Sequence, residues 1–189
     1  MKVAQWRRWL WSVGSYTAAG VVSSAAIGWV LGWLGSALVP APFHEAAVLV
    51  GVLLAVVAIC RELGVLRFRL PQAHRQTSGW LGNRIPPAIV PAAWGFDIGL
   101  TFATWLGLGG ALVLGALAIA IGSPEFGGAL FVAHWIGRAA SVWVAPAWAV
   151  RSHSTGQLLD AIHAQGHLVS RVHAGGIALA AAAALLVAR

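Results

Sequence analysis

Between Arg8 and His44 the chain carries no charged residue. At 1.5 Å of rise per residue, about 20 helical residues cross a hydrocarbon core of about 30 Å. This apolar run is therefore long enough to cross a bilayer, and it predicts a membrane helix near residues 15–39. The run is also far longer than the apolar part of a signal peptide, so we expect it to be retained as the first membrane helix.

The composition indicates that the lipid bilayer surrounds the chain as a whole. Of the 189 residues, 59% are hydrophobic and only 9% are charged, whereas a soluble domain carries about 25% charged residues. The 11 tryptophans and 23 glycines fit this class, because tryptophan collects at membrane interfaces and glycine at helix contacts in lipid. We therefore expect an all-α integral membrane protein with the lipid bilayer as its partner.

The apolar runs predict a bundle of about five transmembrane helices in a single polytopic domain over residues 1–189. The predicted spans are residues 15–39, 46–63, 92–121, 126–150 and 172–187. A six-helix alternative divides the third span into two short helices. An unbroken repeat of small residues from Gly95 to Gly115 favours one helix, kinked near Gly109 and Gly110.

Small residues recur every four positions in several of these spans, a pattern that lets helices approach closely in lipid. In the third span the repeat comprises Gly95, Gly99, Ala103, Gly107, Ala111 and Gly115. A glycine-striped helix followed by a second span occurs at residues 15–63 and again at 92–150. Duplicated halves are common in transporters, but small-residue stripes occur in all membrane bundles, so the repeat favours transport only slightly.

The formal net charge is +7, and the basic residues lie beside the apolar spans rather than in one basic patch. This distribution predicts no nucleic-acid partner and follows the positive-inside rule for membrane proteins. Lys2, Arg7 and Arg8 precede the first span, and five arginines lie within residues 61–84. We therefore expect a multi-pass protein of the cell membrane with a cytoplasmic N-terminus and the C-terminus outside.

Asp97 and Arg138 are the only ionisable residues of opposite sign expected inside the spans. Such residues are costly in lipid and usually pair or face a water-filled cavity. Helical spacing places Thr101 and Thr104 on the face of Asp97, and His134 and Ser141 on the face of Arg138. These residues predict a solute or proton path, whereas the structural alternatives are an ion pair that fixes helix register or residues that reach the interface.

Three histidines in a polar segment raise the question of a metal or haem site. His163 and His167 are spaced to share a helical face, with His153 or His173 as a third ligand. No cysteine or acid cluster accompanies them, so solvated loop histidines are the simpler interpretation. We predict no cofactor, with metal or haem binding through these histidines kept as the alternative.

The segments from Arg61 to Gln76 and from Trp94 to Thr104 resemble small bacterial proteins of the cytochrome-c-biogenesis and DsbD-like transmembrane group. The similarity covers about a third of the chain and rests on glycine-rich helices and a basic loop. It implies a bacterial inner-membrane helix bundle. Members of that group pass reducing equivalents through a pair of membrane cysteines, but this chain has only Cys60. No redox residue carries over.

Three classes of function remain open at this point. The first is a protein that binds or transports a small solute or ion through a polar intramembrane site near Asp97. The second is a non-catalytic subunit or assembly factor that docks a larger membrane complex. For the first class, a chain this short predicts a homo-oligomer that encloses the path. The third is a membrane enzyme or cofactor carrier, which we do not expect because no nucleophilic triad, phosphate loop or zinc-protease motif occurs.

Overall fold

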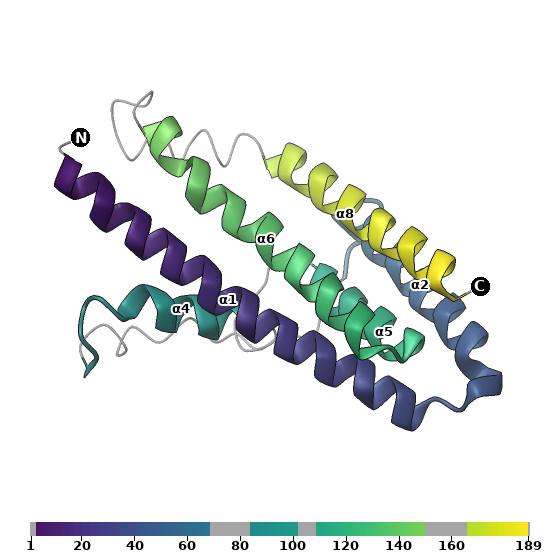
Figure 1. Cartoon of the computed structure of the whole chain (residues 1–189). Helices are drawn as coiled ribbons and strands as arrows, with labels where there is room; N and C mark the ends of the chain where they lie inside the picture. Colours follow the sequence, from purple (N-terminus) through teal and green to yellow (C-terminus); the bar gives the residue numbers. More distant parts are fainter. Residues whose placement is uncertain (1–2, 69–83, 102–108, 150–165, 189) are drawn as a thin grey trace.

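The computed structural model describes residues 3–68, 84–101, 109–149 and 166–188, and across these ranges the chain is helical with no strand. The helices are α1 (Val3–Leu38), η1 (Ala41–Phe43), α2 (His44–Glu62), α4 (Val90–Gly99), α5 (Gly110–Ile121), α6 (Pro124–Ala149) and α8 (Gly166–Val187). They form an elongated bundle in which the start of α1 and the end of α8 lie at opposite ends (Figure 1). The all-α class predicted from composition is confirmed.

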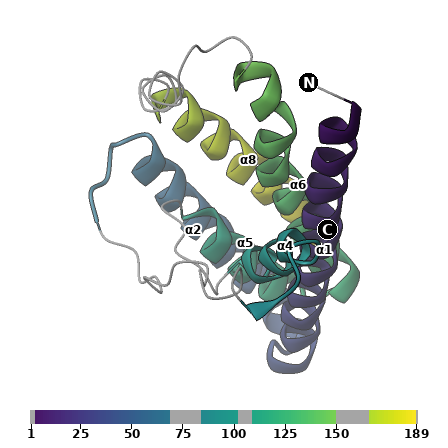
Figure 2. The same cartoon turned by 90° about the vertical axis from the view of Figure 1, so that its left-hand side faces the viewer.

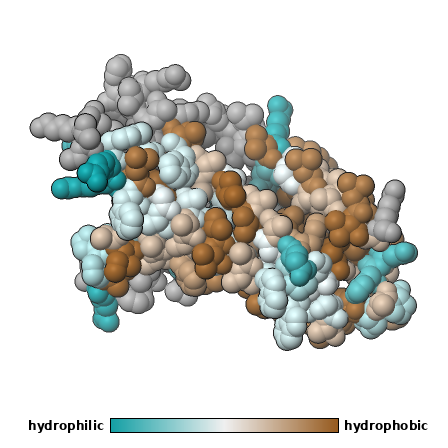
Figure 3. Space-filling view, viewed as in Figure 1, coloured by the Kyte–Doolittle hydropathy of each residue, from teal (hydrophilic) through white to brown (hydrophobic). Residues whose placement is uncertain are grey.

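Within the described ranges, three helical segments are long and apolar enough to cross a membrane: Gln5–Leu38, Ala41–Glu62 and Ser170–Val187. Many of their large apolar side chains point outward, among them Leu53, Leu179 and Leu186. On the face drawn in Figure 3, hydrophobic side chains lie over the middle of the helices and hydrophilic ones toward the two ends. An apolar surface of this extent is typical of membrane helices, because a protein in water rarely exposes one.

The helix predicted over residues 92–121 is interrupted. α4 ends at Gly99, Thr101 takes a left-handed conformation with φ of 63°, and α5 begins only at Gly110. The carbonyl of Gly99 accepts hydrogen bonds from the hydroxyls of Ser24, at 2.8 Å, and Thr101, at 2.9 Å. A continuing helix would bond that carbonyl to a backbone N–H one turn later, so the side-chain hydroxyls compete directly with helix propagation.

The other predicted boundaries agree with the helices to within a few residues, with two exceptions. α1 begins at Val3, well before residue 15, and α8 begins at Gly166 rather than near residue 172. The last helix therefore has 22 residues and is long enough for a full crossing. Its first turns escaped prediction because histidines and Arg171 break the apolar run there.

Glycines hold α1 against α6 in an antiparallel pair. A Cβ on Gly28 would collide with the carbonyl of Gly127, and one on Gly32 with the carbonyl of Ser123. α4 packs on the same helix in parallel, because Gly95 meets the backbone of Tyr16 and Gly99 that of Gly20. These four glycines thus lie at helix contacts, as the small-residue pattern predicts for close approach in lipid.

The main hydrophobic core lies where α2, α5, α6 and α8 meet (Figure 2). Leu117 and Phe131 are fully buried there, and the facing surface of α8 contributes alanines such as Ala184. The far end of α5 reaches α1, since Ile119 meets Gly35. α4 and α5 therefore advance in the same direction along α1, separated by the interruption after Gly99.

Candidate functional site

Two histidines from different helices meet inside the bundle. The rings of His134 on α6 and His173 on α8 lie 6.3 Å apart, centroid to centroid, at an interplanar angle of 64°. The Nε2 atom of each ring is buried and has no hydrogen-bond partner within the described part of the chain. Buried polar atoms almost always have a partner, so these two nitrogens call for a ligand or water that bridges them.

Arg138 lies one turn after His134 on α6. Its Nη1 atom is buried and lacks an acceptor among the described residues. The guanidinium interacts electrostatically with Tyr16 on α1 and with both histidines. We refer to Tyr16, His134, Arg138 and His173 together as the polar cluster, which thus draws on three helices.

Trp135 fixes the position of the polar cluster relative to α1. Its side chain is 1% exposed, and its indole Nε1–H donates to the carbonyl of Thr17 at 2.9 Å. The centroids of the Trp135 and Tyr16 rings lie 5.1 Å apart. Gly20 leaves room for the indole, because a Cβ there would overlap the ring. A second indole, that of Trp143, donates to the Thr17 hydroxyl at 3.0 Å. These contacts fix the rotation of α6 about its axis. They therefore also fix the direction in which the neighbouring residues His134 and Arg138 point.

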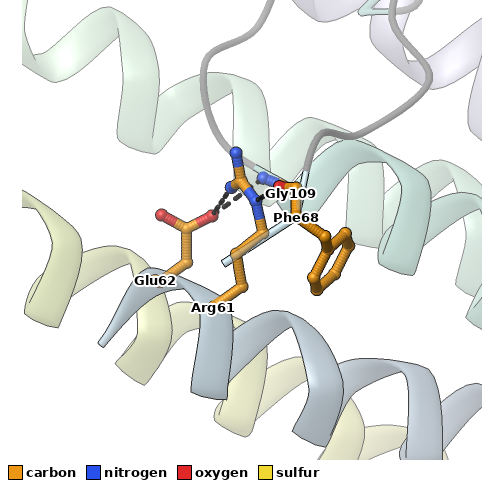
Figure 4. Close-up of polar contacts among 4 residues, drawn as sticks. All are labelled: Arg61, Glu62, Phe68 and Gly109. Atoms are coloured by element: carbon orange, nitrogen blue, oxygen red, sulfur yellow. Dashed lines mark hydrogen bonds and ion pairs between the residues drawn. The ribbon is translucent and has the colours of Figure 1, made fainter. Parts of the chain in front are cut away.

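Glu62 at the end of α2 is an acid that interacts electrostatically with His173. Its Oε1 atom accepts from Arg61 Nη1 at 2.8 Å and from the backbone N–H of Gly109 at 3.0 Å (Figure 4). The Glu62 side chain is 3% exposed, and the Arg61 side chain is 21% exposed. The carboxylate therefore caps the positive end of the α5 dipole, and Arg61 neutralises its charge.

Gly110, the first residue of α5, leaves space beside His173. A Cβ at this position would lie 2.6 Å from both Nε2 and Cε1 of the imidazole and would meet no other residue's side chain within 3.8 Å. The missing side chain therefore lets the backbone at the start of α5 pack directly against the edge of His173 that carries the unpartnered nitrogen. The interruption between α4 and α5 places this glycine at the polar cluster.

The residues predicted around Asp97 are only partly brought together. No ion pair or hydrogen bond joins Asp97 to Arg138 in the described structure: Asp97 belongs to α4, and its buried Oδ2 has no partner there. Thr101 is buried but turns its hydroxyl back to Gly99, and Thr104 lies outside the described residues. Ser141 is exposed and donates to the backbone carbonyl of Arg138 at 2.8 Å.

The predicted histidine site for metal or haem falls largely outside the described residues. His153, His163 and the side chain of His167 lie outside the described part of the chain. Among the residues that are described, no group of three or more His, Cys, Asp or Glu side chains could hold a metal ion. Cofactor binding through these histidines therefore stays a prediction.

Sequence patterns missed three contributors to this region. Tyr16 is the only tyrosine of the chain and lies within an otherwise apolar span, which was a usable signal. Glu62 directly follows Arg61 at the end of a predicted span, and no local pattern links it to His173. His173 was considered only as a metal ligand beside His163 and His167, because no local pattern links it to His134 on another helix.

Comparison with models of known protein families, with curated proteins and with solved structures found no match. The chemistry of the polar cluster must therefore be inferred from its own groups. A guanidinium offers N–H donors and a fixed positive charge. An imidazole donates through one nitrogen, accepts through the other and exchanges protons near neutral pH. A guanidinium beside imidazoles can therefore bind an anion, and the imidazoles can exchange protons next to it.

Proposed function

We propose that the protein is a polytopic membrane protein that binds a small anionic solute at the polar cluster and carries it across the membrane. The proposal keeps the transport class predicted from the sequence. It assigns the solute to His134 and Arg138 of the predicted path, together with Tyr16 and His173, rather than to Asp97.

The arrangement of charges supports a multi-pass topology with a cytoplasmic N-terminus. α1 and α2 are joined by the short turn around η1, and their far ends carry Arg7, Arg8 and Arg61. The turn itself carries Glu45 and no arginine. In this topology α4 and α5 together make one crossing, so the bundle has five crossings. All basic residues except Arg138 and Arg189 then lie on one side, as the positive-inside rule favours.

The observation that carries the proposal is the buried Nη1 atom of Arg138, which has no acceptor among the described residues. A cation within a membrane bundle is costly and normally faces an acid, a backbone carbonyl or a water-filled cavity. Glu62, the acid near the polar cluster, is already paired with Arg61. An anionic solute would provide the missing partner, and the two imidazoles would supply further hydrogen bonds to it.

The interrupted helix gives independent support. In many transporters the substrate lies near the middle of the membrane beside discontinuous helices, because unwound backbone is tolerated there only around a cavity or protein contacts. Here α4 ends at Gly99, and α5 begins at Gly110, whose backbone lies against His173. The start of α5 therefore lies at the polar cluster.

Efflux from proteoliposomes tests this function. Vesicles loaded with chloride or nitrate are diluted into a sulfate medium, and the release is followed with ion-selective electrodes. We expect release several-fold faster with the wild-type protein than with Arg138→Gln. Arg171→Gln, an exposed arginine at the start of α8, is the matched control and should behave as wild type.

The result also separates transport from the subunit alternative. A folded wild-type protein that releases neither anion faster than empty vesicles would contradict the proposal and favour a subunit or assembly factor. Equal release by the wild type and Arg138→Gln would equally contradict a site at Arg138.

A further inference from the structure

The polar cluster is not fully enclosed by the described helices. The side chains of His134, Arg138 and His173 are each half-buried. Their polar atoms point inward, since Nη1 of the arginine and Nε2 of both histidines are buried without a hydrogen-bond partner in the described part of the chain. Each of these side chains therefore joins a buried polar end to a part that reaches the surface of the bundle.

The surface between α6 and α8 beside the cluster lacks large side chains. α6 packs on α1 and α5, whereas α8 packs on α2 and α5, so the two histidines meet where neither helix has its main partner. Gly137 lies three residues after His134, on the same side of α6. Gly176 has the same relation to His173 on α8. Both glycines are exposed, and a Cβ at either would meet nothing within 4 Å. We refer to the surface around these two glycines as the lateral opening.

The lateral opening is surrounded by apolar side chains. Ile136 on α6 is 52% exposed, and Val172 on α8 is 69% exposed. Lipid tails are the surroundings of such side chains on membrane helices. The lateral opening therefore leads from the Arg138 guanidinium directly into the hydrocarbon of the bilayer, and a ligand that enters this way needs a charged end and an apolar body.

The groups at the inner end of the lateral opening favour a carboxylate. The planar guanidinium of Arg138 matches a carboxylate with two parallel hydrogen bonds, and its buried Nη1 has no acceptor among the described residues. Glu62, the acid that interacts electrostatically with the cluster, is already bonded to Arg61 and to the backbone of Gly109. It therefore leaves the guanidinium available to a ligand.

Building on the proposed function, we infer that the site takes a long-chain carboxylate from the bilayer through the lateral opening. The carboxylate binds at Arg138, and the chain lies in the lipid beside Gly137 and Gly176. The glycines matter because they leave the path between α6 and α8 free of side chains. The same guanidinium thus recognises the charge of a small anion and the headgroup of an amphiphile.

Electron paramagnetic resonance of spin-labelled amphiphiles tests the inference. The full-length protein is reconstituted into phosphatidylcholine nanodiscs. A spin-labelled stearate, ionised at alkaline pH, is compared with its uncharged methyl ester. Probe held at the protein gives a motionally restricted spectrum that is distinct from that of probe in free lipid. Because the two probes share one chain, the difference between them reports recognition of the charged headgroup.

We expect the carboxylate to associate with the wild-type protein about tenfold more strongly than the ester, as is typical of hydrogen bonds to a charged group. Arg138→Gln should reduce the carboxylate to the level of the ester. Gly176→Leu should weaken the carboxylate several-fold, because the new side chain occupies the lateral opening.

Gly175→Leu is the matched control for Gly176→Leu. Gly175 is equally exposed and also meets nothing within 4 Å, but it lies two residues after His173 and therefore on the opposite side of α8. It should bind the carboxylate as the wild type does. Both substitutions replace a helical glycine by a stronger helix former, so we expect both variants to fold.

Three results would overturn the inference and leave the proposed function standing. They are equal association of the carboxylate and the ester with the wild type, a carboxylate preference that survives Arg138→Gln, and equal association in Gly176→Leu and Gly175→Leu. The release of chloride and nitrate from proteoliposomes tests the proposed function separately. A wild-type protein that prefers the carboxylate probe but releases neither anion would support the lateral site and contradict transport alone.

Discussion

His134 on α6 and His173 on α8 lie with their ring centroids 6.3 Å apart, and the Nε2 atom of each is buried without a partner among the described residues. Neither nitrogen is therefore hydrogen-bonded by the other ring. Arg138 acts electrostatically on both histidines, and the backbone of Gly110 lies against His173. The fold thus holds polar groups apart inside an apolar bundle, as expected of a binding site and not of a packed core.

Replacing Arg138 by methionine should stabilise the ligand-free protein. The insertion cost of an arginine at the centre of a membrane helix is about 2.5–3.5 kcal/mol, and no acid in the described structure offsets it. Thermal unfolding in detergent without anion should show a higher Tm for Arg138→Met than for the wild type. Arg171→Met, at an exposed position, is the control and should change little.

A lower Tm for Arg138→Met than for the wild type would instead identify a structural ion pair, because removing one member of a buried pair typically costs about 3–5 kcal/mol. Asp97→Asn in the Arg138→Met background extends the test. We expect the two changes to add within about 0.5 kcal/mol, as for sites without shared partners.

Helix packing was largely predictable from the sequence. The repeats of small residues around Gly28 and Gly95 predict close helix approach, and both lie at contacts with another backbone. The break after Gly99 was not predictable, because the same repeat continues through Gly107 and Gly115. What ends α4 is a hydroxyl from α1, that of Ser24, which bonds the Gly99 carbonyl. A contact between residues so distant in sequence leaves no local pattern.

Gly28→Ala should weaken the contact between α1 and α6. Its new methyl group would collide with the backbone carbonyl of Gly127, which cannot rotate away. Overpacking of this kind costs about 1–3 kcal/mol, so the Tm in detergent should fall clearly. Gly137→Ala on the outer face of α6 meets nothing within 4 Å and should leave the Tm unchanged or raise it. A similar Tm for the two variants would contradict the glycine contact.

Glu62→Ala should destabilise the start of α5. The substitution removes the acceptor of the Gly109 N–H and the partner of Arg61. A buried N–H left without an acceptor costs about 1–3 kcal/mol, so we expect a lower Tm and faster hydrogen exchange around Gly110. Glu45→Ala, at an exposed position in the first turn of α2, is the control. Unchanged exchange at Gly110 would show that Glu62 does not hold this helix end.

The candidate site was half predictable. Arg138 and His134 stood out as polar residues one turn apart within an apolar span, and both belong to the polar cluster. Asp97 stood out for the same reason, but α4 packs on α1, and no ion pair with Arg138 forms in the described structure. Pairing between spans depends on helix rotation, which Trp135 sets through its bond to Thr17. Sequence spacing cannot supply that rotation.

The proposed topology predicts that the two ends of α2 face opposite sides of the membrane. In a Cys60→Ala background, Ala41→Cys and Val65→Cys place single thiols at exposed positions before and after α2. A membrane-impermeant maleimide added to intact cells should label position 41 and not position 65. Labelling of both after the cells are opened controls for reactivity, and labelling of position 65 alone in intact cells would reverse the orientation.

The most direct test of an anion site at Arg138 is a crystal structure of the protein grown in bromide, analysed by anomalous diffraction. Bromide is a monovalent anion whose position the anomalous map reports without interpretation of side-chain density. We predict a peak at hydrogen-bonding distance from the Arg138 guanidinium, on the side that faces His134 and His173. An Arg138 guanidinium bonded to a carboxylate of the chain, with no bromide peak beside it, would contradict the account.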